Sequence, residues 1–104
     1  MIKKIEHVGI AVKDLNKSNA LFEKLLGEGS YKTETVEAEG VKTSFFKLGN
    51  QKIELLQAMT SNSPVSKFLN KRGEGMHHLA LHVEDIHKEI QRLEKEGFSF
   101  VSKT

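Results

Sequence analysis

The sequence predicts an α+β protein in which paired βαβββ units form one curved mixed sheet. Three observations lead to this prediction. Short apolar runs rich in β-branched residues alternate with amphipathic helical patterns. The chain has 104 residues, which is the size of one domain. Residues near its start recur about 70 positions later. We expect a single domain over residues 1–104, with the second unit truncated after its first helix and one strand.

The first βαβββ unit is expected to span residues 1–58. Residues 5–12 are rich in β-branched side chains and predict a strand, and Asp14 then provides an N-cap. Apolar residues at helical spacing predict a helix over residues 15–26, which Gly27 ends. Turn-forming residues separate the three strands that follow, at residues 31–38, 41–48 and 52–58.

A connecting helix and turn, residues 59–75, precede the second unit. Ser63 and Pro64 supply an N-cap and a first-turn proline, so a short helix begins there and ends at Gly73. The incomplete second unit is expected over residues 76–104. Its expected elements are a strand beginning at Met76, a helix over residues 86–96 and a strand over residues 98–101.

The two units are related by a repeat. Residues 76–86 align with residues 5–15 without a gap, so that His78 stands where His7 stands 71 residues earlier. The same offset relates Asp14, the N-cap of the first helix, to Asp85, the N-cap of the helix in the second unit. Two copies are too few for a solenoid, and a pseudo-symmetric pair of units is the natural interpretation.

Composition excludes several classes of protein. The absence of cysteine excludes a disulfide scaffold, a thiolate zinc site and a cysteine nucleophile, so any metal must use histidine and carboxylate ligands. No apolar run has the length of a membrane span, and the first residues lack a signal peptide, which predicts a cytoplasmic protein without a membrane partner. The net charge of +2 is too balanced to indicate a nucleic-acid partner.

Strand alternation selects candidate metal ligands. Side chains two residues apart share a face of a strand, and in each copy one face carries a histidine beside very small residues: His7, Gly9 and Ala11 in the first copy, His78, Ala80 and His82 in the second. Histidines beside missing side-chain volume suit a cavity with metal ligands. Glu54 lies in an otherwise apolar strand, where an unpaired buried carboxylate would be costly and a divalent cation would be a good partner.

Each candidate also has an ordinary interpretation. A single strand histidine such as His7 is usually a hydrogen-bonded residue, and Glu54 alone would more often be an edge-strand carboxylate that faces water. His77 has the parity of the packing face, so it is expected to be structural or to support a ligand. His82 is expected at the rim of the cavity and His87 in solvent. Lys67, Lys71 and Arg72 could bind a phosphate, but basic residues on a short exposed helix are usually solvated.

Paired βαβββ units with a histidine in the first strand of each resemble the vicinal oxygen chelate superfamily. This superfamily includes glyoxalase I, extradiol dioxygenases, bleomycin-resistance proteins and methylmalonyl-CoA epimerases. Residues 5–12, 49–56 and 62–80 look specifically like the methylmalonyl-CoA epimerase family. The last stretch is the most discriminating, because a Ser-Pro helix that runs through Gly-Glu-Gly into a double histidine is not shared by the whole superfamily.

The resemblance implies an isomerase of propionate metabolism that interconverts the (R)- and (S)-epimers of methylmalonyl-CoA by proton transfer at C2 through an enolate. It implies a small-molecule acyl-CoA substrate, a homodimer, and His7, Glu54 and His78 as ligands of a divalent metal ion. Co²⁺ is the first choice for that ion, with Mn²⁺, Ni²⁺ or Zn²⁺ as alternatives.

In the epimerase family, two more strands follow, and the last supplies a glutamate that completes the metal site and is thought to act as a catalytic base. That glutamate would lie beyond Thr104. A second acid/base glutamate of some members falls at Thr43 here. From these 104 residues by themselves we therefore expect weak metal binding and little turnover.

Three alternatives remain open. A glyoxalase I-like lactoylglutathione lyase would use the same metal geometry on a glutathione adduct. A non-catalytic binding module of the bleomycin-resistance type would bind its ligand on the concave surface without metal, and such a pocket has no need for three aligned ligand candidates. An inactive domain whose exposed sheet edge is completed by a second copy is the plainest alternative.

Overall fold

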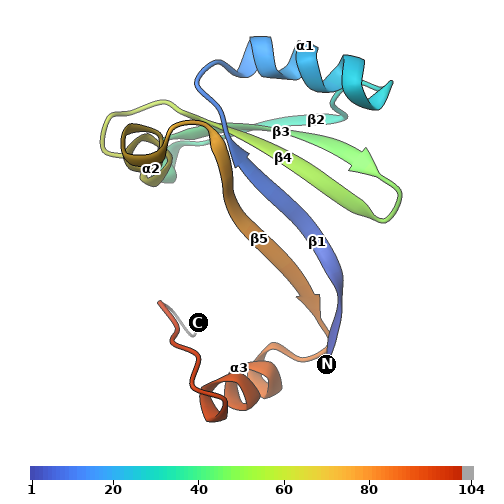
Figure 1. The fold of residues 1–104 in the computed structure, drawn as a ribbon, viewed down its shortest axis with the longest axis vertical. Helices are drawn as coiled ribbons and strands as arrows, with labels where there is room; N and C mark the ends of the chain where they lie inside the picture. Colours follow the sequence, from blue (N-terminus) through green and yellow to red (C-terminus); the bar gives the residue numbers. More distant parts are fainter. Residues whose placement is uncertain (102–104) are drawn as a thin grey trace.

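A computed structural model describes residues 1–101 of the chain. Its strands form the expected curved mixed sheet, and helices pack against that sheet (Figure 1). The elements follow one another as β1 (Ile2–Ala11), α1 (Leu15–Leu26), β2 (Lys32–Val36), the 3₁₀ helix η1 (Glu37–Glu39), β3 (Val41–Leu48), β4 (Gln51–Ala58), α2 (Pro64–Arg72), β5 (Gly75–Val83) and α3 (Ile86–Lys95). The strand order in the sheet is β2-β3-β4-β1-β5. Strands β1 and β4 are parallel, and the other neighbours are antiparallel.

The helix boundaries follow from the capping residues that the sequence predicts. Asp14 accepts a hydrogen bond from the backbone N–H of Lys17 at the start of α1, and Gly27 ends that helix in the left-handed region at φ 82°. Ser63 caps α2 in the same way, and Asp85 repeats the role of Asp14 for α3. The predicted repeat of the strand-to-helix junction is therefore confirmed.

The pairing of β1 with β5 shows how the two copies are arranged. His7 lies opposite Ala80, Gly9 lies opposite His78, and Val8 lies opposite Leu79. If 71 is added to the number of each β1 residue, His7 maps onto His78, the partner of Gly9, and Gly9 maps onto Ala80, the partner of His7. Val8 maps onto Leu79, its own partner. The two strands are therefore related by a local twofold axis that passes near Val8, and this axis brings both histidines to one face. The unit boundaries at residues 58 and 75 stay a prediction.

Both faces of the sheet are covered near the C-terminal end of β1. Helix α1 covers one face through a core cluster with Val12, Leu15, Phe46 and Leu55. Helix α2 lies against the opposite face, where Ala11, Val41, Leu56 and Val65 form a second cluster. The adjacent residues Leu55 and Leu56 belong to different clusters because neighbouring side chains in a strand point to opposite faces.

Two predicted strands differ in the structure. The strand expected over residues 31–38 ends at Val36, because the next three residues form η1, which Gly40 ends at φ 64°. The strand expected over residues 98–101 is wrong: these residues form no strand. A strand needs a neighbour to satisfy its backbone groups, whereas here the N–H of Phe98 bonds back to Leu93 in the last turn of α3.

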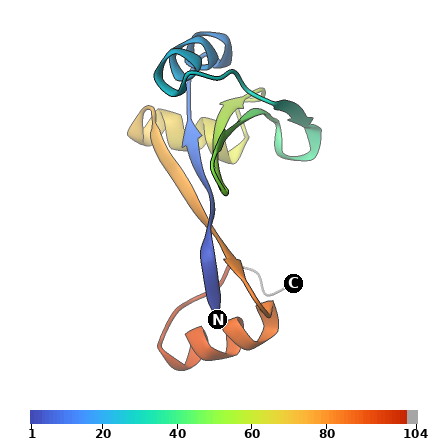
Figure 2. The same cartoon turned by 90° about the vertical axis from the view of Figure 1, so that its right-hand side faces the viewer.

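The second unit extends away from the rest of the sheet. Figures 1 and 2 show α3 beyond the N-terminal end of β1, far from α1 and α2. Its final expected residues, 102–104, lie outside the described part of the chain. Within the described part, no helix combines the length and the apolar character needed to cross a membrane.

Candidate metal centre and adjoining pocket

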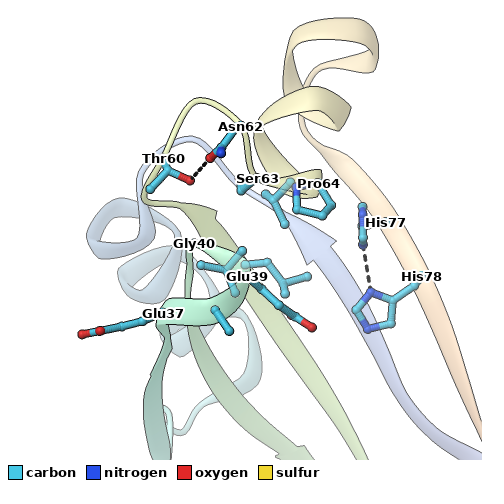
Figure 3. A pocket seen from close by; sticks show the side chains of 13 residues that line it. Glu37, Glu39, Gly40, Thr60, Asn62, Ser63, Pro64, His77 and His78 are labelled. Carbon is cyan, nitrogen blue, oxygen red and sulfur yellow. Dashed lines mark hydrogen bonds between the residues drawn. The ribbon is translucent and has the colours of Figure 1, made fainter. Parts of the chain in front are cut away.

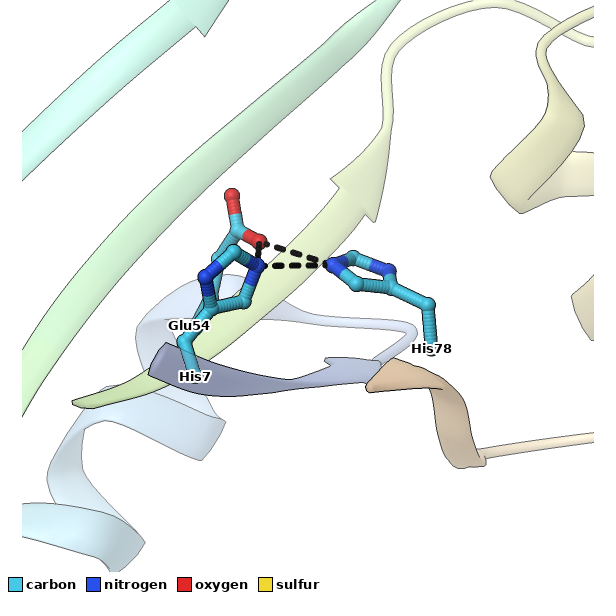
Figure 4. A group of neighbouring side chains, drawn as sticks. All are labelled: His7, Glu54 and His78. Carbon is cyan, nitrogen blue, oxygen red and sulfur yellow. Dashed lines mark hydrogen bonds and ion pairs between the residues drawn. The ribbon is translucent and has the colours of Figure 1, made fainter. Parts of the chain in front are cut away.

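Three side chains from three neighbouring strands converge on the concave face of the sheet (Figure 4). His7 comes from β1, Glu54 from β4 and His78 from β5. The Nε2 atoms of the two histidines are 3.0 Å apart. Glu54 Oε1 lies 3.3 Å from each of these nitrogens. The two histidines that strand alternation placed on one face thus meet the carboxylate of Glu54 at one point.

These separations fit ligands of one metal ion. Metal–nitrogen and metal–oxygen bonds of roughly 2.0–2.1 Å place neighbouring ligand atoms about 2.9 Å apart at a right angle and about 3.4 Å apart at a tetrahedral angle. The three distances here, 3.0, 3.3 and 3.3 Å, fall within that range. The donor set of two imidazole nitrogens and one carboxylate oxygen suits a first-row divalent cation.

Gly9 makes this convergence geometrically feasible. Gly9 lies on β1 between two of the candidate ligands: its pairing partner on β4 is Glu54, and its pairing partner on β5 is His78. A Cβ atom at this position would overlap the imidazole ring of His78. The missing side chain at Gly9 is therefore the space that the ring occupies, as the small residues beside the histidines predicted.

The electrostatic environment of the ligands favours a cation. Burial raises the pKa of Glu54, partly offset by the nearby His7. Burial also lowers the pKa of His78, and the proximity of His7 lowers it further. A low histidine pKa keeps the Nε2 lone pair available for coordination. A bound divalent cation would offset the burial cost of Glu54 and would be coordinated by the neutral imidazole of His78.

Glu6 supports His7 from the side opposite the centre. Its Oε1 lies 2.7 Å from His7 Nδ1, and Lys52 Nζ lies 2.8 Å from its Oε2. The ammonium of Lys52, followed by His7, lowers the pKa of Glu6 to about 2. The ionised carboxylate accepts the Nδ1–H of His7 and so directs the Nε2 lone pair toward Glu54, as in carboxylate–histidine–metal arrangements.

Sequence reasoning missed Glu6 because strict alternation places it on the face opposite His7. The structure shows a register shift in the β1–β5 pairing between Ile5 and His7, where β1 carries one extra residue. A bulge of this kind re-aims a side chain. The sequence signal that could have identified Glu6 is its position directly before His7, a candidate ligand.

His77 supports the second histidine. Its Nδ1 is 2.9 Å from His78 Nδ1, so one ring donates to the other, and its ring also contacts Phe68 of α2 edge-on at 5.1 Å between centroids. Burial is the main cause that lowers the pKa of His77. Among the described residues, it stands outside the three-residue cluster. Its parity predicted the packing face, but His77 is the extra residue of β5 at a register shift between Gly9 and Ile10, and it borders the pocket together with His78.

A pocket of about 650 Å³ adjoins the centre through His78 (Figure 3). Its floor is apolar and includes Val41, Leu56 and Val65, and its polar rim comes from the loop between β4 and α2. In that loop, the hydroxyl of Thr60 donates to Asn62 Oδ1 at 2.8 Å. Sequence reasoning did not place these loop residues, because short polar loops give no signal of which cavity they border.

The remaining sequence candidates lie elsewhere. His82, His87, Lys67, Lys71 and Arg72 are exposed. Thr43, at the position of the family's second acid/base glutamate, is buried, and its hydroxyl has no hydrogen-bond partner among the described residues. Neither the metal centre nor the pocket includes any of these residues.

Comparisons with known proteins agree with this architecture. A hypothetical protein of Bacillus halodurans has a solved structure that superimposes with a TM-score of 0.91 at 35% identity, over 96% of this chain and 72% of that one. A variant of Streptomyces coelicolor methylmalonyl-CoA epimerase in complex with 2-nitronate-propionyl-CoA gives a TM-score of 0.89 at 28% identity, over 99% of this chain and 76% of that one.

Curated relatives include both enzymes and an uncharacterized protein. Human mitochondrial methylmalonyl-CoA epimerase is 35% identical over 95% of this chain, which spans 57% of that protein. The ethylmalonyl-CoA/methylmalonyl-CoA epimerase of Cereibacter sphaeroides is 38% identical over 93% of this chain and 73% of its own length. The uncharacterized Bacillus subtilis protein YqjC is 32% identical over 98% of this chain and 73% of its own length.

The family model for the glyoxalase/bleomycin resistance protein/dioxygenase superfamily matches residues 6–104, which is nearly the whole chain. The match begins within β1 and includes all three residues of the candidate metal centre. It is consistent with the paired strands, the local twofold axis and the histidine in each first strand. The chain therefore belongs to the glyoxalase/bleomycin resistance protein/dioxygenase superfamily.

Proposed function

We propose that the chain supports metal-dependent epimerisation of methylmalonyl-CoA by proton transfer at C2. The observation that carries this proposal is the convergence of His7, Glu54 and His78 beside a pocket of about 650 Å³. The named epimerases among the relatives and the solved structures support the choice of reaction. The substrate would be a small-molecule acyl-CoA, as in the Streptomyces coelicolor complexes with a CoA ester.

His7, Glu54 and His78 would hold the metal ion, which we propose to be Co²⁺, with Mn²⁺, Ni²⁺ or Zn²⁺ as alternatives. When bound, the ion supplies Lewis acidity that stabilises negative charge on a carbonyl oxygen. Each protein group then has a separate task. Glu6 keeps His7 in the tautomer with a free Nε2, and Gly9 leaves space for the His78 ring.

The pocket would receive the acyl portion of the substrate. Its apolar floor at Val41, Leu56 and Val65 suits an alkyl substituent at C2, and the polar rim suits carbonyl or carboxylate oxygens. A homodimer and a cytoplasmic location stay predictions. So does the participation of a family glutamate that would lie beyond Thr104.

A glyoxalase I-like lyase would use the same three ligands, so the reaction itself must separate the two activities. The test is deuterium incorporation at C2 of methylmalonyl-CoA in heavy water, with the cobalt-loaded protein and a His7→Ala control. Because the family glutamate would lie beyond Thr104, we expect incorporation by the wild type to be slow, and we expect the control to lose it. No incorporation with cobalt bound, together with turnover of the hemithioacetal of methylglyoxal and glutathione, would replace the epimerase proposal with the lyase.

A metal-free binding module makes a different prediction. It would retain its ligand affinity after chelation, because His7, Glu54 and His78 would have no metal to hold. We expect instead that a chelator removes one equivalent of cobalt and abolishes the exchange.

A further inference from the structure

We propose that Glu39 is a proton-transferring base of this site. The inference rests on the proposed function, since it assigns a residue to the carbon–hydrogen bond that epimerisation must break. Neither strand alternation nor the family pattern points to Glu39. The family pattern instead directs attention to position 43, where a buried threonine stands.

The position of Glu39 is set by the fold of η1. The three residues of this 3₁₀ helix end at Gly40, whose left-handed conformation at φ 64° turns the chain into β3. Gly40 is buried, and a Cβ atom there would overlap the hydroxyl of Thr60. The close approach of the β4–α2 loop therefore holds the end of η1, and with it Glu39, at the pocket.

Glu39 borders the same pocket as His77 and His78. Figure 3 shows its side chain leaving η1 toward the β5 side of the pocket, where His78 lies. The carboxylate therefore borders the pocket next to the centre without being one of the three candidate ligands.

The other nearby carboxylates are engaged or point elsewhere. Glu6 is held by Lys52 and His7, and Glu34 on β2 forms an ion pair with Lys32. Glu37 shares η1 with Glu39 and also borders the pocket, but its carboxylate points to the side away from His77 and His78 (Figure 3).

The carboxylate of Glu39 forms neither a side-chain hydrogen bond nor an ion pair with any residue in the described range 1–101. An unpartnered carboxylate that faces the pocket is free to accept a proton. Glu39 borders the substrate pocket and is also exposed to solvent, so its carboxylate can take a proton from the substrate and exchange it with water.

The chemical step is a reversible proton transfer. The C2–H bond of the thioester breaks and an O–H bond forms on the Glu39 carboxylate. The electron pair of the broken bond moves into the C1–C2 bond, and the carbonyl oxygen gains the negative charge of the enolate. In the reverse direction, the proton returns to C2 and the carboxylate is regenerated. In heavy water, the exposed carboxylic acid exchanges its proton with solvent before the return, so deuterium enters C2.

The test compares Glu39→Gln with Glu37→Gln, which removes an equal charge from the same 3₁₀ helix. Both variants and the wild type are loaded with cobalt, cobalt affinity is measured by visible absorption, and deuterium incorporation at C2 is followed in heavy water. We expect all three proteins to bind cobalt alike. Incorporation should fall by about 100-fold or more for Glu39→Gln, the typical effect of a general base, and stay within about twofold for Glu37→Gln.

The outcomes separate this inference from the function on which it rests. Exchange by Glu39→Gln at the wild-type rate would overturn the role of Glu39 and leave the epimerase proposal standing. An inactive wild type that still binds cobalt would overturn the epimerase proposal and the role of Glu39 with it. Cobalt binding also reports folding, so a Glu39→Gln protein that binds cobalt but fails to exchange supports the assignment.

Discussion

The substitution Gly9→Ala tests the geometry of the metal centre most specifically. The added Cβ would overlap the imidazole ring of His78, which must then rotate away from its position 3.0 Å from His7 and 3.3 Å from Glu54. A displaced ring removes one of three ligands. By analogy with the loss of groups that orient metal ligands, we expect cobalt affinity to fall about 10- to 100-fold, or about 1.4–2.7 kcal/mol.

The same substitution should leave the fold largely intact. Gly9 does not adopt a positive φ, so alanine suits its backbone conformation. Replacing glycine at such a position restricts the unfolded chain and contributes roughly 0.4–1 kcal/mol of stability. This gain offsets part of the cost of moving a partly exposed ring. We expect the free energy of unfolding of the metal-free protein to change by less than about 1 kcal/mol.

Cobalt titrations followed by visible absorption and urea unfolding of the metal-free protein measure the two effects separately. Gly29→Ala is the matched control, because Gly29 also lacks a positive φ and lies in the loop after α1, away from the centre. Wild-type cobalt affinity in Gly9→Ala would refute the steric argument. Equal losses of affinity in Gly9→Ala and Gly29→Ala would show that the effect is not specific to the His78 ring.

Three further predictions follow from individual contacts. Glu6→Gln should weaken cobalt binding by about 10-fold, because a neutral amide holds the Nδ1–H of His7 less firmly than a carboxylate; an unchanged titration would contradict this role. The folded-state pKa of Glu6 is lowered from 4.5 to about 2, so its contribution to stability is fully present above pH 4.5 and is lost as the pH falls toward 2. The metal-free wild type should therefore be more stable than Glu6→Gln by about 1 kcal/mol at pH 6, after allowance for solvent screening, and urea unfolding should show this difference vanish near pH 2. Phe46→Ala should lower the free energy of unfolding by about 3–5 kcal/mol, since Phe46 is 1% exposed in the cluster beneath α1; a loss below about 1 kcal/mol would contradict that packing.

Local sequence signals predicted most of the fold because the same residues that carry those signals make the contacts. Asp14 and Asp85 begin helices through hydrogen bonds to nearby backbone N–H groups, so a few residues contain all the necessary information. The strand expected over residues 98–101 failed because strand formation depends on a neighbour that local sequence does not provide. The early end of β2 at Val36 depends on a 3₁₀ turn that alternation cannot reveal.

The candidate site was predictable where strand alternation held. It placed His7 and His78 on one face, and the 71-residue repeat explains why a local twofold axis brings them together. Glu6 escaped prediction because the bulge in β1 changes the direction of its side chain. Glu39 escaped it because the pocket joins η1, a loop and β5, which are distant in sequence and meet only in the folded chain.

Stoichiometric metal binding tests the central claim most directly. The measurement is a cobalt titration of the wild type and of His78→Ala, with the bound ion quantified after removal of excess metal. We predict one equivalent per wild-type chain, with the visible absorption of cobalt bound by nitrogen and oxygen ligands, and a large loss of affinity in His78→Ala. Absence of binding by the wild type, or equal affinity in the variant, would contradict a metal centre formed by His7, Glu54 and His78.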